Sequence, residues 1–255
     1  MAGRSTNPAT ILGRVALRAL VRAVGGRGML RIVQSVEPSL VGAWSHSDYP
    51  RHLLDADFAR ASDLAAPHTL VDVLRRHELW TLIGQAAKLA PGDILEVGVW
   101  RGGTGLLIAQ AMHHFDAGGT LYLADTFSGV VKAGALDDHY VGGEHADVSH
   151  SDVVKLFEAH AKVPIEILAG MFPEDTAARL KGSLRLVHVD VDVYQGARDV
   201  VEWCYDRIVP GGIVVFDDYG FSTTSGVTRL CEEYERDDRF VFLHNANGHA
   251  VLIKR

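Results

Sequence analysis

Short apolar runs and stretches with helical periodicity alternate along the chain from about residue 92 onward. The apolar runs are predicted to be strands, and they cover residues 93–99, 120–126, 165–171, 184–191 and 211–219. The stretches between them are predicted to be helices, at residues 103–115, 151–162, 195–208 and 224–236, with a further short helix starting at Pro173. Because the strands are apolar throughout and are separated by helices, the pattern predicts a parallel sheet with helices on both faces.

The two ends of this pattern complete the predicted fold. Residues 239–246 and 248–255 are predicted to form a hairpin around Asn247-Gly248, and residues 68–89 a helix that leads into the first strand. We therefore predict a doubly wound, mostly parallel seven-stranded α/β sheet with an antiparallel C-terminal hairpin strand. This domain is expected to cover residues 68–255, after an N-terminal helical extension over residues 1–67.

The first 36 residues differ in charge from the rest of the chain, because they carry six arginines and no acidic residue. Arg14, Arg18 and Arg22 interrupt the apolar stretch, which argues against a signal peptide and against a transmembrane span. Arginines four residues apart with aliphatic residues between them are typical of an amphipathic helix. We expect an arm that packs on the core or on another subunit, and the alternative is binding to a membrane surface.

Composition narrows the function classes further. The net charge of −7 provides no basic surface for nucleic acid, so we expect no nucleic-acid partner. The two cysteines, Cys204 and Cys231, fall within predicted helices and do not form a CxxC pair. We interpret them as reduced core residues of a cytoplasmic protein.

A glycine-rich turn, "LEVGVWRGGTG" at 95–105, follows the first strand. In doubly wound sheets this turn approaches a nucleotide, although the spacing here is not the dinucleotide pattern G-x-G-x-x-G. Asp125 ends the second strand, where an acid can accept the ribose hydroxyls. Glu96 lies inside the first strand and needs a partner if it is buried. The turn and Asp125 together indicate an adenosine-containing ligand, and the alternative is a tight structural turn beside a surface aspartate.

Four carboxylates end two of the predicted strands. Asp190 and Asp192 end one run, "LRLVHVDVDVYQG", and Asp217 and Asp218 end the next, "GGIVVFDDYG". Residues two apart on a strand share a face, so Asp190 and Asp192 are expected to project together at the ligand-binding edge of the sheet. Oxygen ligands of this kind suit Mg²⁺, Mn²⁺ or Ca²⁺ rather than zinc.

The structural alternative for these carboxylates is that some of them cap helices or pair with arginines such as Arg198 or Arg229. One acidic pair alone does not decide between these interpretations. Two pairs on successive strands favour a cation site.

The polar, glycine-rich segment 128–150, here called the lid, follows the second strand. A lid that closes over substrate is the functional interpretation, and a solvated loop is the alternative. His145 and His150 are interpreted as incidental. His139 is a candidate general base, because imidazole exchanges protons near neutral pH.

Taken together, "ILEVGVWRGG", "ADTFSG", "LDDH", "DVDVYQG" and "PGGIVVFDDY" resemble the macrocin O-methyltransferase family, which includes the mycinamicin and novobiocin sugar O-methyltransferases. The resemblance runs from about His68 to the C-terminus. It implies a class I S-adenosylmethionine-dependent fold and a divalent metal, Mg²⁺ or Mn²⁺. It also implies methyl transfer to a deoxysugar hydroxyl in antibiotic biosynthesis.

The resemblance also implies roles for individual residues. Asp190, Asp217 and Asp218 match the metal ligands. Asp192 matches the acid proposed as general base in the aminocoumarin enzyme, and His139 the lid histidine proposed for that role in the macrolide enzyme. We favour His139 slightly, because a base that arrives with the lid does not compete for the metal. The residues that match cofactor positions are Thr69, Glu96, Gly98, Asp125 and Ser128.

Two other functions remain as alternatives, a metal-dependent hydrolase and a non-catalytic nucleotide-binding module. The first leaves the glycine turn and Asp125 without a role, and the second leaves the carboxylates without one. We expect a small sugar or a glycosylated natural product as substrate, no membrane partner, and a homo-oligomer that is a dimer or a tetramer. The sequence leaves open which sugar and which hydroxyl are used, and whether the sugar is linked to a nucleotide or to an aglycone.

Overall fold

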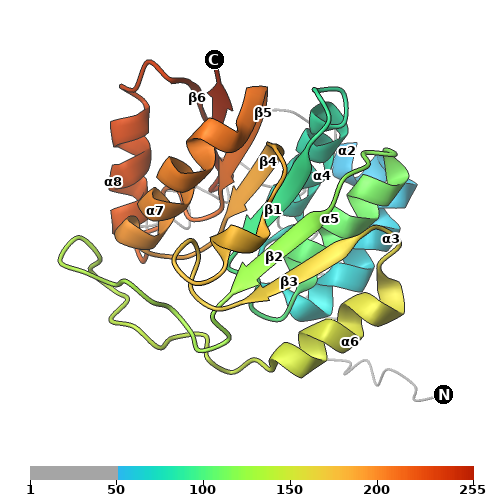
Figure 1. Ribbon diagram of the computed structural model, residues 1–255, viewed down its shortest axis with the longest axis horizontal. Coiled ribbons are helices and arrows are strands. Elements are labelled where there is room, and N and C mark those ends of the chain that lie inside the picture. The colour runs from blue at the N-terminus through green and yellow to red at the C-terminus, as the bar shows by residue number, and fades with distance from the viewer. Residues whose placement is uncertain (1–50) are drawn as a thin grey trace, which may run out of the picture. The chain divides into compact units, whose positions relative to one another are not determined.

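The computed structural model describes residues 51–255, and the amphipathic helix predicted within residues 1–36 lies outside them. The described chain forms a seven-stranded sheet (Figure 1). Strands β1 to β5 are parallel to one another, whereas β7 is antiparallel to both of its neighbours. The predicted sheet is therefore confirmed. In spatial order the strands are β3 (Ile165–Ala169), β2 (Leu121–Asp125), β1 (Asp93–Val97), β4 (Leu184–Val189), β5 (Ile208–Phe216), β7 (Ala250–Lys254) and β6 (Phe240–His244).

Helices cover both faces of this sheet and enclose two apolar cores, because side chains alternate between the faces along each strand. One core includes Ile94, and the other includes its neighbour Leu95. The helices on the Ile94 face are α3 (Ala56–Ala65), α4 (Val73–Ala86), α5 (Gly103–His114) and α6 (His150–His160). The helices on the Leu95 face are α7 (Tyr194–Cys204) and α8 (Ser225–Tyr234), as Figure 1 shows.

The prediction of a short helix starting at Pro173 was wrong. The structure has turns there and then a 3₁₀ helix, η2 (Ala177–Arg179). Its backbone hydrogen bonds change from four-residue spacing, Ala177 N to Pro173 O at 3.1 Å, to three-residue spacing, Arg179 N to Thr176 O at 3.0 Å. The segment is thus too short and too tightly wound for a full α-helix.

Residues 51–255 belong to one compact unit of the chain. It includes two helices from the predicted extension, α2 (Arg51–Leu54) and α3, and α3 packs against α5. We therefore propose that any separate N-terminal extension ends before this unit, earlier than the predicted boundary at residue 67.

Both cysteines are free and buried, Cys204 in α7 and Cys231 in α8, where the sequence placed them. No helix within residues 51–255 has both the length and the apolar character that crossing a lipid bilayer requires.

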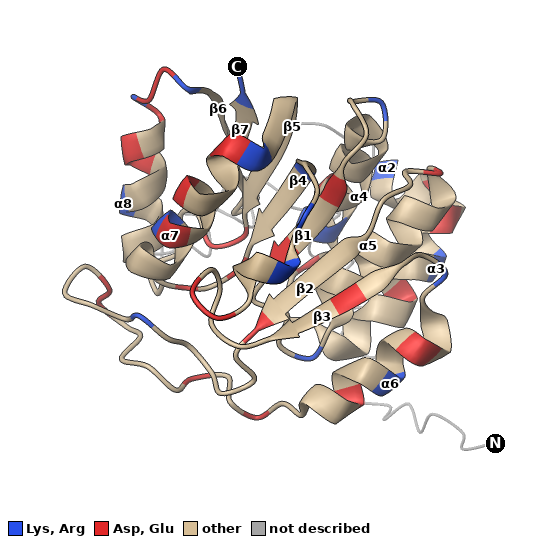
Figure 2. Cartoon of the chain, viewed as in Figure 1, with Lys and Arg blue, Asp and Glu red and all other residues tan. Residues whose placement is uncertain are grey.

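The carboxyl ends of the five parallel strands meet at one edge of the sheet, where the lid begins (Figure 1). Figure 2 shows acidic segments in the loops that follow β4 and β5 at this edge. Ligands bind at this edge in open α/β sheets, so the fold brings the candidate residues to the expected place.

Candidate functional site

A cavity of about 350 Å³ opens at this edge of the sheet, a size within the range of small-molecule sites. The turn after β1, the end of β2, the loops after β4 and β5, and part of the lid line it. Three residues of the predicted site, Glu96, Ser128 and His139, are not among the lining residues. The predicted residues that do line it are Thr69, Gly98, Asp125, Asp190, Asp192, Asp217 and Asp218.

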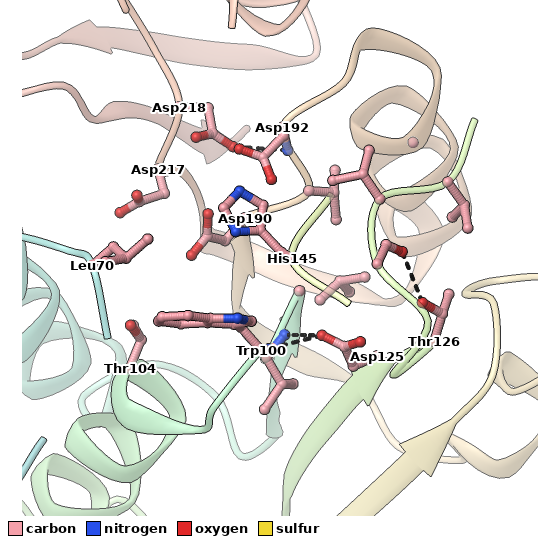
Figure 3. A pocket seen from close by; sticks show the side chains of 18 of the residues that line it. Leu70, Trp100, Thr104, Asp125, Thr126, His145, Asp190, Asp192, Asp217 and Asp218 are labelled. Atoms are coloured by element: carbon pink, nitrogen blue, oxygen red, sulfur yellow. Dashed lines mark hydrogen bonds between the residues drawn. The ribbon is translucent and has the colours of Figure 1, made fainter. Parts of the chain in front are cut away.

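Hydrogen bonds from the glycine turn to the Asp125 side chain connect this turn to the end of β2. Its Oδ2 accepts hydrogen bonds from the backbone N–H groups of Val99, at 2.7 Å, and Trp100, at 2.8 Å. Its Oδ1 accepts one from Phe127 N at 2.7 Å. Figure 3 shows the Trp100 ring lying across the cavity between Asp125 and the other aspartates. Asp125 therefore shapes the turn, and its remaining lone pairs can still accept from a ligand hydroxyl.

Gly98, in the turn after β1, tolerates no side chain. Its φ is +92°, and a Cβ there would lie 1.6 Å from the carbonyl oxygen of Asp190. The close approach follows from the sheet, since Asp190 N donates to Val97 O at 2.9 Å. The turn after β1 and the acidic loop after β4 are thus in direct backbone contact.

The four aspartates gather on one side of the cavity, as predicted (Figure 3). Carboxylate oxygens of Asp190, Asp217 and Asp218 all lie within 4.8 Å of one another. Asp218 Oδ2 also accepts from Asp192 N at 3.0 Å. The argument from a shared strand face was wrong for Asp192, because β4 ends at Val189 and Asp192 has a left-handed φ of +65°. A turn, not the pleat of a strand, brings Asp192 to the cavity.

Arg75 of α4 is the arginine that pairs with this group. It contacts Asp217 Oδ2 and donates to Asp217 O at 3.0 Å, and its guanidinium lies 4.9 Å from the centre of the Phe221 ring. Arg198 and Arg229, the arginines suggested by the structural alternative, instead lie 3.8 and 3.7 Å from Glu233. Within residues 51–255, the four carboxylates thus have one guanidinium in contact with them, and it contacts Asp217.

This imbalance changes the acidity of the carboxyl groups. Burial, followed by repulsion from Asp217 and Asp218, holds the pKa of Asp190 well above its usual range. Burial, followed by repulsion from Asp192 and Asp217, does the same for Asp218. Burial also acts to raise the pKa of Asp217, but the imidazoles of His188 and His249 outweigh it, and this pKa is lowered. A cation in the cavity would stabilise the ionised forms of Asp190 and Asp218.

Glu96 has the partner that its buried position required. His188 Nδ1 lies 3.1 Å from Glu96 Oε1, and both side chains are fully buried. Burial raises the pKa of Glu96, although His188 partly offsets the effect. Gly105 leaves room for this carboxylate, because a Cβ at residue 105 would lie 2.5 Å from Glu96 Oε2.

The lid places Tyr140 and His145 in the cavity, not His139. The Tyr140 hydroxyl lies 3.4 Å from His145 Nε2, and burial together with the neighbouring Asp192 charge raises the pKa of Tyr140. His139 is exposed, with its ring packed edge-on against Tyr140 at 5.2 Å. Ser128 is exposed at the start of the lid.

Several contacts hold the lid in this position. Asp137 Oδ1 accepts from the backbone N–H of Tyr194 at the start of α7, at 2.9 Å. Lys132 Nζ lies 2.5 Å from Glu174 and 2.6 Å from Asp199. The lid is thus tied to the α7 side of the sheet.

Sequence reasoning missed several residues of this site. Arg75 and His249 come from elements far from the acidic loops in the sequence, so no local pattern identified them. His188 had a usable signal, since it is a polar residue inside an apolar run beside Asp190.

The sequence profile of the macrocin-O-methyltransferase (TylF) family matches residues 55–242 of the chain. This span includes the glycine turn, the lid and all four aspartates of the cavity.

The chain belongs to the macrocin O-methyltransferase family.

Two relatives of the chain are named as O-methyltransferases of tetracenomycin C and mycinamicin compounds. The chain is 30% identical over 164 residues to the 8-demethyl-8-(2,3-dimethoxy-α-L-rhamnosyl)-tetracenomycin-C 4'-O-methyltransferase of Streptomyces olivaceus, covering 60% of this chain and 62% of the relative. It is 29% identical over 166 residues to the mycinamicin III 3''-O-methyltransferase of Micromonospora griseorubida, covering 60% and 65%. The chain therefore spans less than two thirds of the length of these relatives.

The structure of the O-methyltransferase NovP has the same fold as this macrocin O-methyltransferase family member. It superposes with a TM-score of 0.62 at 24% identity, covering 73% of this chain and 82% of NovP. This similarity confirms the predicted class I methyltransferase fold.

Proposed function

We propose that the protein transfers a methyl group from S-adenosylmethionine to a deoxysugar hydroxyl in antibiotic biosynthesis, with the help of Mg²⁺ or Mn²⁺. Family membership and the activities for which the two relatives are named support this proposal. The observation that carries it is the meeting of a glycine turn and an all-carboxylate cluster in one cavity. The first suits a nucleoside cofactor and the second a cation that can bind hydroxyls.

The residues present fit a divalent cation. Asp190, Asp217 and Asp218 offer oxygen ligands within 4.8 Å of one another, and oxygen-only sets are what Mg²⁺ and Mn²⁺ prefer. When bound, such a cation would supply a lowered pKa to a sugar hydroxyl that it contacts. Arg75 then remains as the protein's own positive charge beside Asp217.

The residues proposed to hold S-adenosylmethionine act in different ways. Gly98 and Asp125 shape the turn that lines the cavity, and Asp125 also offers acceptor oxygens to a ribose. Thr69 lines the cavity, and its hydroxyl lies 2.8 Å from that of Thr104. For Glu96 we propose a supporting role behind the turn, because it is fully buried, and Ser128 remains a proposal at the start of the lid.

The sequence favours His139 slightly as the general base, whereas the geometry favours Asp192. Asp192 lines the cavity beside the other carboxylates, whereas His139 is exposed and outside the lining. In this proposal Asp192 accepts the proton of the acceptor hydroxyl. The lid, held by Asp137 at the start of α7, excludes water from the cavity.

Replacement of the two candidates separates them. Asp192→Asn is expected to lower kcat by roughly 10²–10⁴-fold, the usual contribution of a general base, whereas His139→Ala leaves kcat almost unchanged. Steady-state kinetics with saturating cofactor and Mg²⁺ measures both values. The reverse outcome, an active Asp192→Asn beside an inactive His139→Ala, would return the role to the histidine.

Asp125 provides a test of the cofactor end of the cavity. Asp125→Ala is expected to weaken S-adenosylhomocysteine binding by about 1.5–3 kcal/mol, since a charge-assisted hydrogen bond to the ribose is lost. Titration calorimetry measures the change, and Asp152→Ala on the exposed surface of α6 is the matched control. Unchanged affinity in Asp125→Ala would exclude Asp125 from the cofactor site.

The charges of the cavity favour a sugar on an uncharged aglycone over a nucleotide-linked sugar. Within residues 51–255, Arg75 and Lys132 are the arginine and lysine that line the cavity, and both are paired with carboxylates. A diphosphate would find no free arginine or lysine in this lining, so the proposed cation alone would offset its charge beside the four aspartates.

We also propose that the protein is cytoplasmic and that it forms a homo-oligomer.

Methyl transfer from labelled S-adenosylmethionine to a panel of acceptors tests the proposed function. The panel contains 6-deoxyhexosides of apolar aglycones and the matching nucleoside-diphosphate sugars, analysed by mass spectrometry. We expect a product that carries one extra methyl group on the sugar of a glycoside. Methylation of the nucleotide sugars alone would overturn the proposal that the acceptor sugar is linked to an uncharged aglycone. If the enzyme binds S-adenosylhomocysteine but methylates neither set, the proposal that its acceptor is a sugar would be overturned.

A further inference from the structure

A row of five ionisable side chains, four of them buried and the fifth, Glu78, partly exposed, crosses the α4 side of the sheet behind the cavity. Glu96 of β1 and His188 of β4 are direct neighbours in the strand register. Asp217 lies two residues beyond the β5 residue that pairs with His188, so it shares their face. His249 immediately precedes β7, and Glu78 reaches the row from α4. We call this set the buried row.

The contacts in the buried row converge on one oxygen of Asp217. His249 Nε2 lies 3.0 Å from Asp217 Oδ1, and His249 Nδ1 lies 2.9 Å from Glu78 Oε2. On the other side, His188 Nε2 lies 3.7 Å from the same Oδ1 and has no hydrogen-bond partner among the described residues. His249 is therefore the imidazole that makes a hydrogen bond to Asp217, and the other oxygen, Oδ2, faces Arg75.

Glu78 holds His249 in one orientation. Asn247 Nδ2 donates to Glu78 Oε2 at 2.6 Å, and Asn245 Nδ2 donates to Oε1, so both oxygens of Glu78 have partners from the β6–β7 turn. His249 itself is fully buried. A ring with one nitrogen on a fixed carboxylate and the other on Asp217 cannot turn without breaking both contacts.

The position of Asp217 matters because it is the member of the carboxylate cluster that the protein holds most firmly. His249 and Arg75 each bind one of its oxygens, whereas the contact to Asp218 comes from a backbone N–H group. Groups that orient a ligand in this way typically change metal affinity by 10–100-fold when they are removed.

We propose that His249, oriented by Glu78, is a positioning residue that fixes the Asp217 carboxylate for cation binding with Asp190 and Asp218. The proposal rests on the proposed function, because it requires a cation in the cavity. His249 acts only through Asp217 and does not line the cavity.

The test compares Mn²⁺ binding by electron paramagnetic resonance in the wild type, His249→Leu and His249→Gln. His249→Leu is expected to bind Mn²⁺ 10–100-fold more weakly, while its affinity for S-adenosylhomocysteine stays at the wild-type value. His249→Gln can still donate to Asp217 and is expected to recover part of the affinity. His244→Leu, an exposed residue of the same hairpin, is the matched control and should behave as wild type.

Steady-state kinetics of the same variants test the proposal independently of Mn²⁺ binding. The Mg²⁺ concentration for half-maximal rate should rise in His249→Leu, with kcat largely restored at saturating Mg²⁺. If His249→Leu is poorly folded, Glu78→Gln serves instead. This substitution weakens the contact between residue 78 and His249 Nδ1, and it should also lower the affinity for Mn²⁺.

The outcomes separate this inference from the proposed function. A wild type that binds no Mn²⁺ would overturn the proposed cation and this inference with it. A wild type that binds Mn²⁺ beside a His249→Leu variant of equal affinity would overturn the inference alone. Loss of Mn²⁺ and S-adenosylhomocysteine binding together in both variants would also overturn it, because the effect would then be general disruption.

Discussion

Asp218→Asn is expected to lower the rate of methyl transfer by roughly 10²–10³-fold or more, the scale seen when a main electrostatic group of an active site is removed. Asp218 is buried, and its carboxylate belongs to the cluster within 4.8 Å of Asp190 and Asp217. The amide that replaces it keeps the shape but lacks the charge. Since the glycine turn and Asp125 lie on other strands, affinity for S-adenosylhomocysteine should change little.

Turnover at saturating substrate and calorimetry with S-adenosylhomocysteine measure the two effects separately. Asp206→Asn, at an exposed position of the 3₁₀ helix η3 (Tyr205–Arg207), is the matched control. Wild-type turnover in Asp218→Asn would remove Asp218 from the active site.

Gly98→Ala is expected to abolish cofactor binding and to lower the free energy of unfolding by about 3 kcal/mol or more, from strained backbone and overpacking together. The added Cβ would lie 1.6 Å from the carbonyl oxygen of Asp190, and the φ of +92° disfavours any side chain. The turn after β1 or the acidic loop after β4 must therefore move.

Urea unfolding and calorimetry with S-adenosylhomocysteine test this expectation. Gly134→Ala in the exposed lid is the control, because a Cβ there meets only Asp137 Oδ2, at 4.0 Å. If Gly98→Ala kept both wild-type stability and wild-type affinity, the close packing of the turn against Asp190 would be disproved.

The sequence allowed most of the fold to be predicted, because strands buried on both faces produce uninterrupted apolar runs. The runs that became β1, β2, β3, β4 and β5 were all identified, with ends that differ by a few residues. The prediction was wrong where the spacing of backbone hydrogen bonds decides between an α-helix and a tighter turn. The segment after Pro173 forms turns and a 3₁₀ helix, which apolar periodicity does not distinguish from a short α-helix.

The candidate site was predictable only as far as it depends on strand ends. Asp190 and Asp217 were expected to meet because each follows a parallel strand, and the structure brings them together. Asp192 also reaches the cavity, but through a left-handed turn that no strand pattern predicts. Glu96 was recognised as needing a partner, yet the strand register that supplies His188 is a property of the folded sheet.

Arg75 and Tyr140 could not be predicted for a different reason. Arg75 lies 142 positions before Asp217 in the sequence, and the packing of α4 on the sheet brings the two together. Tyr140 lines the cavity in place of its neighbour His139, because the path of the lid decides which side chain turns inward. Tertiary packing and loop geometry set both contacts.

The dependence of methyl transfer on a divalent cation tests the central claim most directly. The enzyme is freed of metal with a chelator, and the initial rate is then measured with a glycoside acceptor and S-adenosylmethionine over a range of added Mg²⁺. The account predicts almost no transfer without metal and a saturable recovery as Mg²⁺ is added, absent in Asp218→Asn. Full activity in the presence of the chelator would contradict the account.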